Sequence, residues 1–132
     1  MEQLFYTMSI SSFYAQNKDG SFTKTDCKEL GDLYGFKLVK HRPVGIEFEN
    51  TQWIISEYST GLIIGWFTSG KNMAYLPTNS GKLNMVEVKW DDMIRKMMGM
   101  ISNSRLNEVM KNKIKVEEKV RDNKVLQTAN LF

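Results

Sequence analysis

The chain has 132 residues, of which 42% are hydrophobic and 25% are charged, and its formal net charge is +3. This composition is typical of one globular domain and excludes disorder over most of the chain. The single cysteine, Cys27, excludes an internal disulfide, and one histidine leaves too few ligands for a structural zinc site.

The N-terminus and the apolar runs of the chain indicate where in the cell the protein is expected. The N-terminus lacks the basic and apolar regions of a secretion signal, and no apolar run reaches membrane-spanning length. We therefore expect a single cytoplasmic domain over residues 1–132, with no membrane association.

The first third of the chain predicts a strand, a turn and a helix. Alternating apolar residues from Leu4 to Ile10 favour a strand, although Phe13 and Tyr14 would also extend a helical face. Lys18 to Ser21 forms a turn signal around Asp-Gly. Thr23 to Asp26 then has the form of a capping box, which predicts a short helix ending at Gly35 and carrying Cys27, Leu30, Leu33 and Tyr34 on one face.

The middle of the chain predicts antiparallel strands. Residues 36–41 and 46–49 alternate around a turn at 42–45. Residues 52–67 form the densest apolar and aromatic run, broken at Ser59-Thr60-Gly61, which is the usual pattern of a β-hairpin and predicts the centre of the sheet. A short helix capped by Thr68 is expected over 68–76, ending before Pro77, and residues 83–90 fit either a strand or the approach to a helix.

The last third predicts two helices that cover the sheet. Asp91 and Asp92 are placed to cap the first, whose inward face would carry Met93, Ile94, Met97, Met98 and Ile101. Ser102 to Ser104 recaps the chain before a second helix over about 105–127, whose apolar stripe is interrupted by Lys113, Glu117 and Lys124. Burial of that stripe by oligomerisation and a solvated surface helix are the two explanations.

These elements predict an α+β fold: an antiparallel β-sheet of about five strands, with a short N-terminal-half helix and two C-terminal helices packing on it. The sheet region would span about residues 1–90 and the helical region about 91–127.

The reactive residues do not form a catalytic or metal site by spacing. His41 beside Arg42 has no nucleophile or orienting group at a recognisable spacing in the sequence, and Cys27 is interpreted as a buried core thiol. Glu47 and Glu49 share a strand face without further metal ligands, and the glycines do not form a phosphate-binding loop. We therefore expect no enzyme activity, no catalytic or metal-binding residues and no cofactor.

Trp90 is the tryptophan that suggests binding, because Trp53 and Trp66 are explained by packing within the hairpin. It lies between Lys89 and Arg95, where an indole beside cations can stack a nucleobase while the cations hold phosphate. Packing of Trp90 under the helix is the alternative.

The start of the second helix is the other candidate for ligand binding. Basic residues outnumber acidic ones between Lys89 and Arg121, a bias that favours an anionic partner or makes a solvated helix surface. Helix N-termini and Arg both bind anions, although Ser-Asn-Ser before a helix is also an ordinary cap. The predicted ligand-binding residues are therefore Trp90, Arg95, Asn103, Arg105, Asn107 and Lys111.

The run from Trp53 through Thr60-Gly61 to Leu62, followed by Thr68, resembles a pattern of small phage-encoded accessory proteins over roughly a quarter of the chain. The sheet with C-terminal helices is similar to Thoeris anti-defence sponges, which capture the cyclic ADP-ribose signal of bacterial immunity. The resemblance implies an oligomeric, non-enzymatic protein that holds a nucleotide beside its C-terminal helices.

The resulting functional hypothesis is a phage-type counter-defence protein in the host cytoplasm that sequesters a cyclic nucleotide or an ADP-ribose-derived immune signal. The expected partners are a small anionic nucleotide or a host protein, with homo-oligomer formation through the C-terminal helices. Two alternatives are a protein-binding inhibitor of a host nuclease or other host enzyme, and a nucleic-acid-binding accessory protein.

Overall fold

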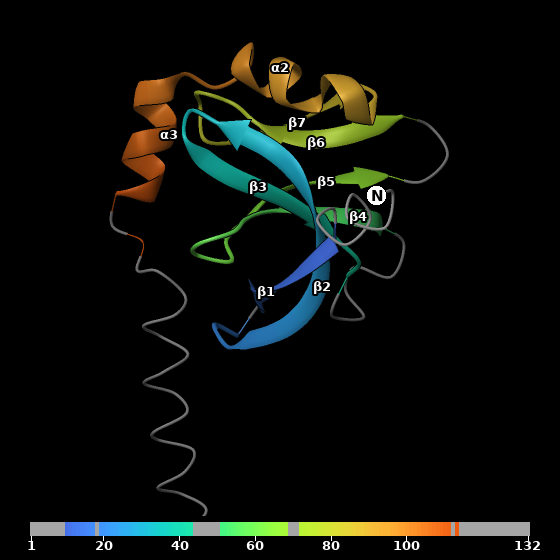
Figure 1. Ribbon diagram of the computed structural model, residues 1–132. Helices are drawn as coiled ribbons and strands as arrows, with labels where there is room; N and C mark the ends of the chain where they lie inside the picture. The colour runs from blue at the N-terminus through green and yellow to red at the C-terminus, as the bar shows by residue number, and fades with distance from the viewer. Residues whose placement is uncertain (1–9, 18, 44–50, 69–71, 112, 114–132) are drawn as a thin grey trace, which may run out of the picture.

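The computed structural model describes residues 10–17, 19–43, 51–68, 72–111 and 113. They form a seven-stranded antiparallel sheet with two α-helices packed on one face (Figure 1). The predicted α+β class and the antiparallel sheet are confirmed, whereas the predicted number of about five strands is too low. The strands are β1 (Ile10–Gln16), β2 (Phe22–Leu33), β3 (Phe36–His41), β4 (Thr51–Glu57), β5 (Ile63–Thr68), β6 (Met73–Pro77) and β7 (Leu83–Glu87).

The sheet is a meander in which each strand pairs with the next along the chain. The predicted hairpin forms its central pair, β4 and β5, joined by a turn that contains Ser59-Thr60-Gly61. Within the turn, the buried Glu57 carboxylate accepts hydrogen bonds from the backbone N–H groups and hydroxyls of Ser59 and Thr60. The carboxylate thereby holds the hairpin closed.

The predicted helix over 23–34 is wrong, because these residues form β2. Its apolar residues are buried on opposite faces of the sheet. Cys27 packs with Phe13, Ala15 and Val39 on one face, and Leu33 packs in the main core between the sheet and the helices on the other. A register shift between Glu29 and Gly31 allows this, since a bulge changes which face the following side chains occupy. Pairing with β1 and β3 on either side then satisfies the backbone of β2, and tertiary pairing overrides the local helical spacing.

The predicted helix over 68–76 is also wrong, because Met73–Pro77 is strand β6. Ala74 and Leu76 are fully buried while their neighbours are partly exposed, which is the alternation of a strand. The Thr68 hydroxyl, predicted to cap a helix, instead donates to the Met73 carbonyl oxygen at 2.9 Å. For residues 83–90, the strand interpretation holds over β7.

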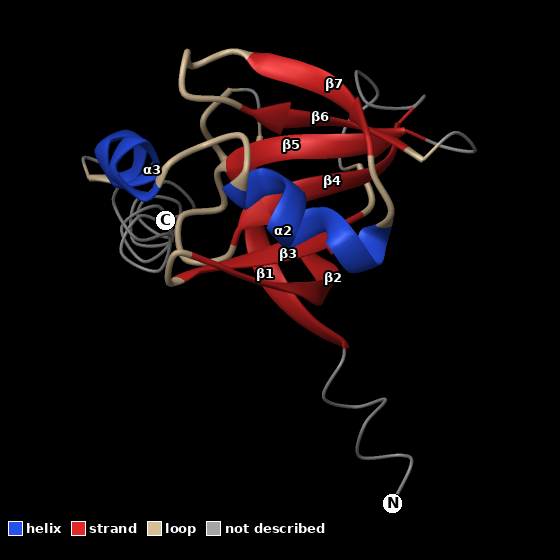
Figure 2. Cartoon of the chain, turned by 90° about the horizontal axis from the view of Figure 1, so that it is seen from above, coloured by secondary structure: helices blue, strands red, loops and turns tan. Residues whose placement is uncertain are grey.

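The C-terminal elements cover one face of the sheet, as predicted. A short 3-10 helix, η2 (Trp90–Asp92), leads into α2 (Met93–Met98), and α3 (Asn103–Met110) follows. Seen from above in Figure 2, α2 lies across the strands and α3 stands beyond its C-terminal end. The main core joins the helices to the sheet through buried side chains that include Met93, Met97, Ile101, Leu106, Leu38, Ile55 and Leu76.

Three details of these helices test the predictions. Ser102 accepts a hydrogen bond from the Arg105 N–H at 3.2 Å, which confirms the predicted recapping of α3. Asp92 precedes α2 without a side-chain cap bond, and its carboxylate instead pairs with Arg95. Met98, predicted to face inward, is 50% exposed because it lies one residue beyond the buried Met97 on the helix surface.

A second, smaller cluster lies on the opposite face of the sheet and contains Phe13, Ala15, Cys27 and Val39. Here β1 approaches the β4–β5 turn, where the Gln16 N–H donates to the Gly61 carbonyl oxygen at 3.1 Å. Cys27 is a buried thiol, as predicted.

Several predicted features lie outside the described residues. They are the strand residues Leu4 to Ser9, the strand at 46–49 with Glu47 and Glu49, and the part of the second helix beyond residue 113, with Glu117 and Lys124. Within the described residues, the predicted helix over about 105–127 ends early, because α3 stops at Met110 and Lys113 lies outside it.

Candidate anion-binding site

Trp90 lies at the centre of an aromatic cluster between η2 and the middle of the sheet. Its ring packs against Phe67, with ring centroids 4.5 Å apart and planes inclined by 32°, and meets Trp53 edge-on at 6.3 Å. Trp53 and Phe67 are direct partners in the β4–β5 ladder, so they occupy the sheet face that η2 crosses. The packing interpretation of Trp90 is therefore correct.

Trp66 lies apart from this cluster. Its partner across the ladder is Ile54 rather than Trp53, and its ring packs on Tyr75 of β6 with centroids 5.1 Å apart. Because successive side chains of a strand point to opposite faces, Trp66 and Phe67 project to opposite sides of the sheet.

Three cations surround the two indoles. The Lys40 Nζ lies 4.0 Å from the Trp90 ring centroid and 5.1 Å from that of Trp53. The Arg42 guanidinium carbon lies 4.1 Å from the Trp53 centroid, and the Lys28 Nζ lies 6.0 Å from it. These distances are those of cation–π contacts. We call Lys28, Lys40, Arg42, Trp53 and Trp90 the cation–indole site.

The strand register explains how residues from distant parts of the sequence meet here. Lys28 of β2 and Lys40 of β3 are direct cross-strand partners, and Arg42 follows Lys40 by two positions and shares its face. Lys40 in turn pairs with Ile55, two residues from Trp53, so the indole shares that face. Three neighbouring strands therefore supply the site, and η2 adds Trp90 from above.

The electrostatics of the site favour an anion. Burial, together with the positive charges of Lys28 and Arg42, lowers the pKa of the Lys40 ammonium, and the Asp91 carboxylate opposes the shift. Like charges directly opposite each other on a sheet destabilise it. Within the described part of the chain, the ion pairs join Lys37 to Glu29, Arg95 to Asp92 and Arg105 to Glu108, and none involves Lys28 or Lys40.

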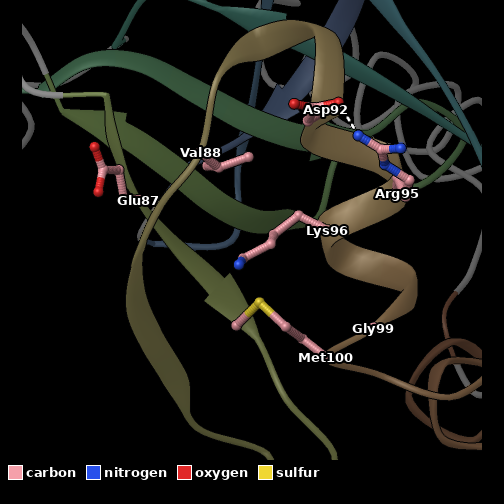
Figure 3. A pocket seen from close by; sticks show the side chains of 7 residues that line it. All are labelled: Glu87, Val88, Asp92, Arg95, Lys96, Gly99 and Met100. Carbon is pink, nitrogen blue, oxygen red and sulfur yellow. Dashed lines mark hydrogen bonds and ion pairs between the residues drawn. The ribbon is translucent and has the colours of Figure 1, made fainter.

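Arg95 was predicted to act beside Trp90, but the two residues face different strands. Arg95 is paired with Asp92 and lines a hollow of about 400 Å³ between α2 and the end of β7 (Figure 3). Glu87, Val88, Lys96, Gly99 and Met100 complete its lining. The hollow thus holds two cations and two carboxylates, so its charge is balanced and it does not select an anion.

Of the remaining predicted residues, Asn103, Arg105 and Asn107 lie on α3 and Lys111 is its C-cap, at the far end of α2 from Trp90 (Figures 1 and 2). The Asn107 amide donates to the Asn103 carbonyl and side-chain oxygens at 2.9 and 2.6 Å. Arg105 pairs with Glu108, and its Nε is buried without a hydrogen-bond partner among the described residues. Asn107 and Lys111 line a second, open hollow of about 520 Å³ with Phe36, Ser104, Glu108 and Met110.

The six predicted residues therefore do not form one site. Of these residues, Trp90 alone belongs to the cation–indole site, where Lys28, Lys40, Arg42 and Trp53 were missed. A signal for the cations is present in the sequence, since Lys40 lies on the predicted strand over 36–41 and Arg42 follows it by two positions, at the start of the predicted turn. The partner strand, however, has the sequence pattern of a helix, so the sequence does not indicate that Lys28 lies opposite Lys40.

His41 lies between these cations in the sequence but on the other face of the sheet. Its Nδ1 donates to the Arg42 carbonyl oxygen at 2.9 Å, because a carbonyl can only accept, and Nε2 then accepts from the Ser56 hydroxyl at 2.9 Å. Both side chains are buried, and burial lowers the pKa of His41. This histidine and serine therefore satisfy each other's hydrogen-bonding groups in a buried position.

Comparison with protein-family models, curated protein sequences and solved structures finds no match to this chain. Among the helices in the described ranges, none combines the length and apolar character needed to cross a membrane. The same residues contain no group of three or more His, Cys, Asp or Glu side chains placed to hold a metal ion.

Proposed function

We propose that the protein acts by binding rather than by turnover, and that it sequesters an anionic nucleotide at the cation–indole site. The observation that carries this proposal is the gathering of Lys28, Lys40 and Arg42 around two adjacent indoles, with Lys40 4.0 Å from Trp90. A cluster of one sign of charge raises the local concentration of oppositely charged ligands.

Packing supports this role by holding the cations in place before a ligand arrives. Trp53 and Trp90 pack against Phe67 and the main core, so the two rings on which the cations lie are held in place. Groups fixed in advance lose less conformational entropy on binding, which favours the tight affinity that a sequestering protein needs.

The counter-defence part of the proposal rests on the resemblance of the Trp53 to Leu62 run to phage accessory proteins. A protein that captures a signalling nucleotide in stoichiometric amounts needs no catalytic group, which is consistent with a site made of cations and indoles. Assembly through the C-terminal helices remains part of the proposal, and light scattering of the purified protein tests it.

The test is capture of a nucleotide from a cell extract. The purified protein is incubated with extract from bacteria with active immune signalling, washed and denatured, and the released small molecules are identified by mass spectrometry. We expect one nucleotide to be enriched by the natural protein and lost with Lys40→Gln. Lys82→Gln is the matched control, because it removes the same charge from an exposed turn.

Two outcomes would overturn the proposal in favour of the alternatives. A stable complex with a host protein and no released nucleotide would indicate an inhibitor of that protein. Binding of nucleic acid with affinity that falls steeply as salt rises would indicate a nucleic-acid-binding protein, because phosphate-backbone binding depends on counterion release.

A further inference from the structure

We propose that β7 is a dimerisation edge, along which a second copy of this chain adds its own β7 in the antiparallel direction and joins the two sheets. This assembly is separate from the proposed function, because the cation–indole site takes no part in it. Three features of β7 support it: free backbone groups, exposed apolar side chains beside them, and an edge that complements itself.

The backbone of β7 has one free side. Among the described strands, β7 lies at the end of the sheet and pairs with β6 alone (Figure 2). At the two ends of this ladder, the Thr78 N–H donates to the Lys82 carbonyl oxygen and the Val88 N–H donates to the Asn72 carbonyl oxygen. Hydrogen-bonded and non-hydrogen-bonded pairs alternate in an antiparallel ladder, so the odd-numbered residues of β7 turn their N–H and C=O groups outward. These residues are Leu83, Met85 and Glu87. Within the described part of the chain, no hydrogen bond reaches their outward groups.

The usual protections of a strand edge are absent from β7. Proline, lysine or a bulge commonly prevents an edge strand from pairing with another chain. β7 contains no proline and no lysine, and its register with β6 is unbroken. At the opposite end of the sheet, by contrast, the β4–β5 turn lies against β1, where the Gln16 N–H donates to the Gly61 carbonyl oxygen. Among the described strands, β7 therefore offers the more open edge.

The side chains beside the free backbone groups are apolar and exposed. Leu83 is 37% exposed and Met85 is 55% exposed. They lie on the sheet face away from the helices, because Val86, next to Met85, packs against the main core. Met85 is the cross-strand partner of Tyr75, whose ring packs on Trp66 of β5. An apolar row therefore crosses three strands and ends at the open edge, where its burial by a partner would be favourable.

The edge is complementary to itself when a two-fold axis passes between the two copies of Asn84. Leu83 of each copy then lies opposite Met85 of the other, and each of these pairs exchanges both of its N–H···O bonds. On the other face the exposed Asn84 side chains meet, and they can bond to each other because an amide both donates and accepts. An axis at Met85 would instead set Leu83 opposite the Glu87 carboxylate, which places a charge against an apolar side chain.

The length of the edge sets the strength of the dimer. A strand of five residues spans about 17 Å, so the contact belongs with small interfaces that bury less than about 1,200 Å² in total. The main core, in addition, is built within one chain. We therefore expect a monomer that folds by itself and a reversible dimer with a dissociation constant in the micromolar range.

The test is analytical ultracentrifugation of the full chain over concentrations that span the micromolar range. We expect a dimer at high concentration that dissociates on dilution to the chain mass of 15.3 kDa. Met85→Lys should weaken the dimer by at least about tenfold, because it places an ammonium at the edge of both copies. Met98→Lys is the matched control, since it makes the same change at a methionine of α2 that is 50% exposed, and it should leave the dimer unchanged. Thermal melts establish that both variants fold.

Cysteine substitution tests the register independently. Directly opposite residues of a non-hydrogen-bonded pair have Cα atoms about 4.5 Å apart, within the range that a disulfide bridges. Asn84→Cys should therefore form a disulfide-linked dimer under mild oxidation. Met85→Cys should form one much more slowly, because its two copies would be diagonal neighbours about 7 to 8 Å apart. The buried Cys27 thiol is common to both variants and does not account for a difference between them.

Three results would overturn the inference, and none of them bears on nucleotide capture. The first is a monomer at every concentration. The second is a dimer that Met85→Lys does not weaken, or weakens no more than Met98→Lys does, which places the interface elsewhere, such as on the C-terminal helices. The third is a disulfide that forms faster in Met85→Cys than in Asn84→Cys, which contradicts the pairing about Asn84.

Discussion

Replacement of Gly61 by alanine should loosen the contact between β1 and the β4–β5 turn. Gly61 has a φ of +71°, and a Cβ at this position would lie 2.3 Å from the Tyr14 carbonyl oxygen and 3.1 Å from the Gln16 nitrogen. The substitution therefore combines an unfavourable backbone conformation with a collision against the backbone of β1.

The two costs can be separated with Gly20. Its φ of +89° is also positive, but, apart from its two chain neighbours, none of the residues that the structure describes lies within 4 Å of a Cβ built there. Gly20→Ala should cost about 1 kcal/mol for the backbone conformation alone. Gly61→Ala should cost about 3 kcal/mol, because displacement of β1 adds about 2 kcal/mol to the same backbone term.

The assay is thermal unfolding followed by circular dichroism, together with hydrogen exchange of the Gln16 amide. For a domain of this size, we expect the melting temperature to fall by about 4 °C for Gly20→Ala and about 12 °C for Gly61→Ala. The Gln16 N–H donates to the Gly61 carbonyl oxygen, so its exchange should accelerate in Gly61→Ala and not in Gly20→Ala. Equal melting temperatures for the two variants would refute the close approach of β1 to the turn.

Three further predictions concern the core, a helix cap and the buried histidine. In urea denaturation, Met97→Ala should lower the free energy of unfolding by about 3 kcal/mol, because Met97 is fully buried. Met98 is half-exposed, so Met98→Ala should change this free energy by less than about 0.5 kcal/mol. Equal losses for the two variants would contradict the orientation of α2. Ser102→Ala should cost about 1 kcal/mol in the same assay, since it removes the cap of α3, and unchanged stability would show that this bond contributes nothing. Burial lowers the pKa of His41 below its unfolded value of 6.5. The contribution of the neutral ring to the free energy of unfolding is therefore complete above pH 6.5. It falls as the pH drops toward the folded pKa, by at most about 1.4 kcal/mol per pH unit. Proton NMR titration of the His41 ring checks this directly, and an ordinary midpoint near 6.5 would be the contrary result.

The sequence by itself determined the elements whose local signals agree. The run from Gln52 to Phe67 contains β-branched and aromatic residues on both sides of a glycine-containing turn, and it forms the central hairpin. Met93, Met97 and Ile101 repeat at helical spacing and bury one face of the C-terminal segment. The cap at Ser102 also follows from neighbouring residues alone.

Only the tertiary structure decided the state of β2 and β6. Cys27 and Leu33 fit one face of a helix, yet they lie on opposite faces of a bulged strand. Local spacing does not distinguish these two arrangements, since the outcome depends on whether β1 and β3 are available to pair with the segment.

The candidate site depended on tertiary structure even more strongly. Trp90 was identified from its basic neighbours, but its cations come from Lys28, Lys40 and Arg42, which are remote in the sequence. The pairing of Lys28 with Lys40 follows from the register of β2 against β3, including the bulge at Gly31. A register shift of one residue would move a strand's side chains to the other face, so the site exists only once long-range pairing has chosen the alignment.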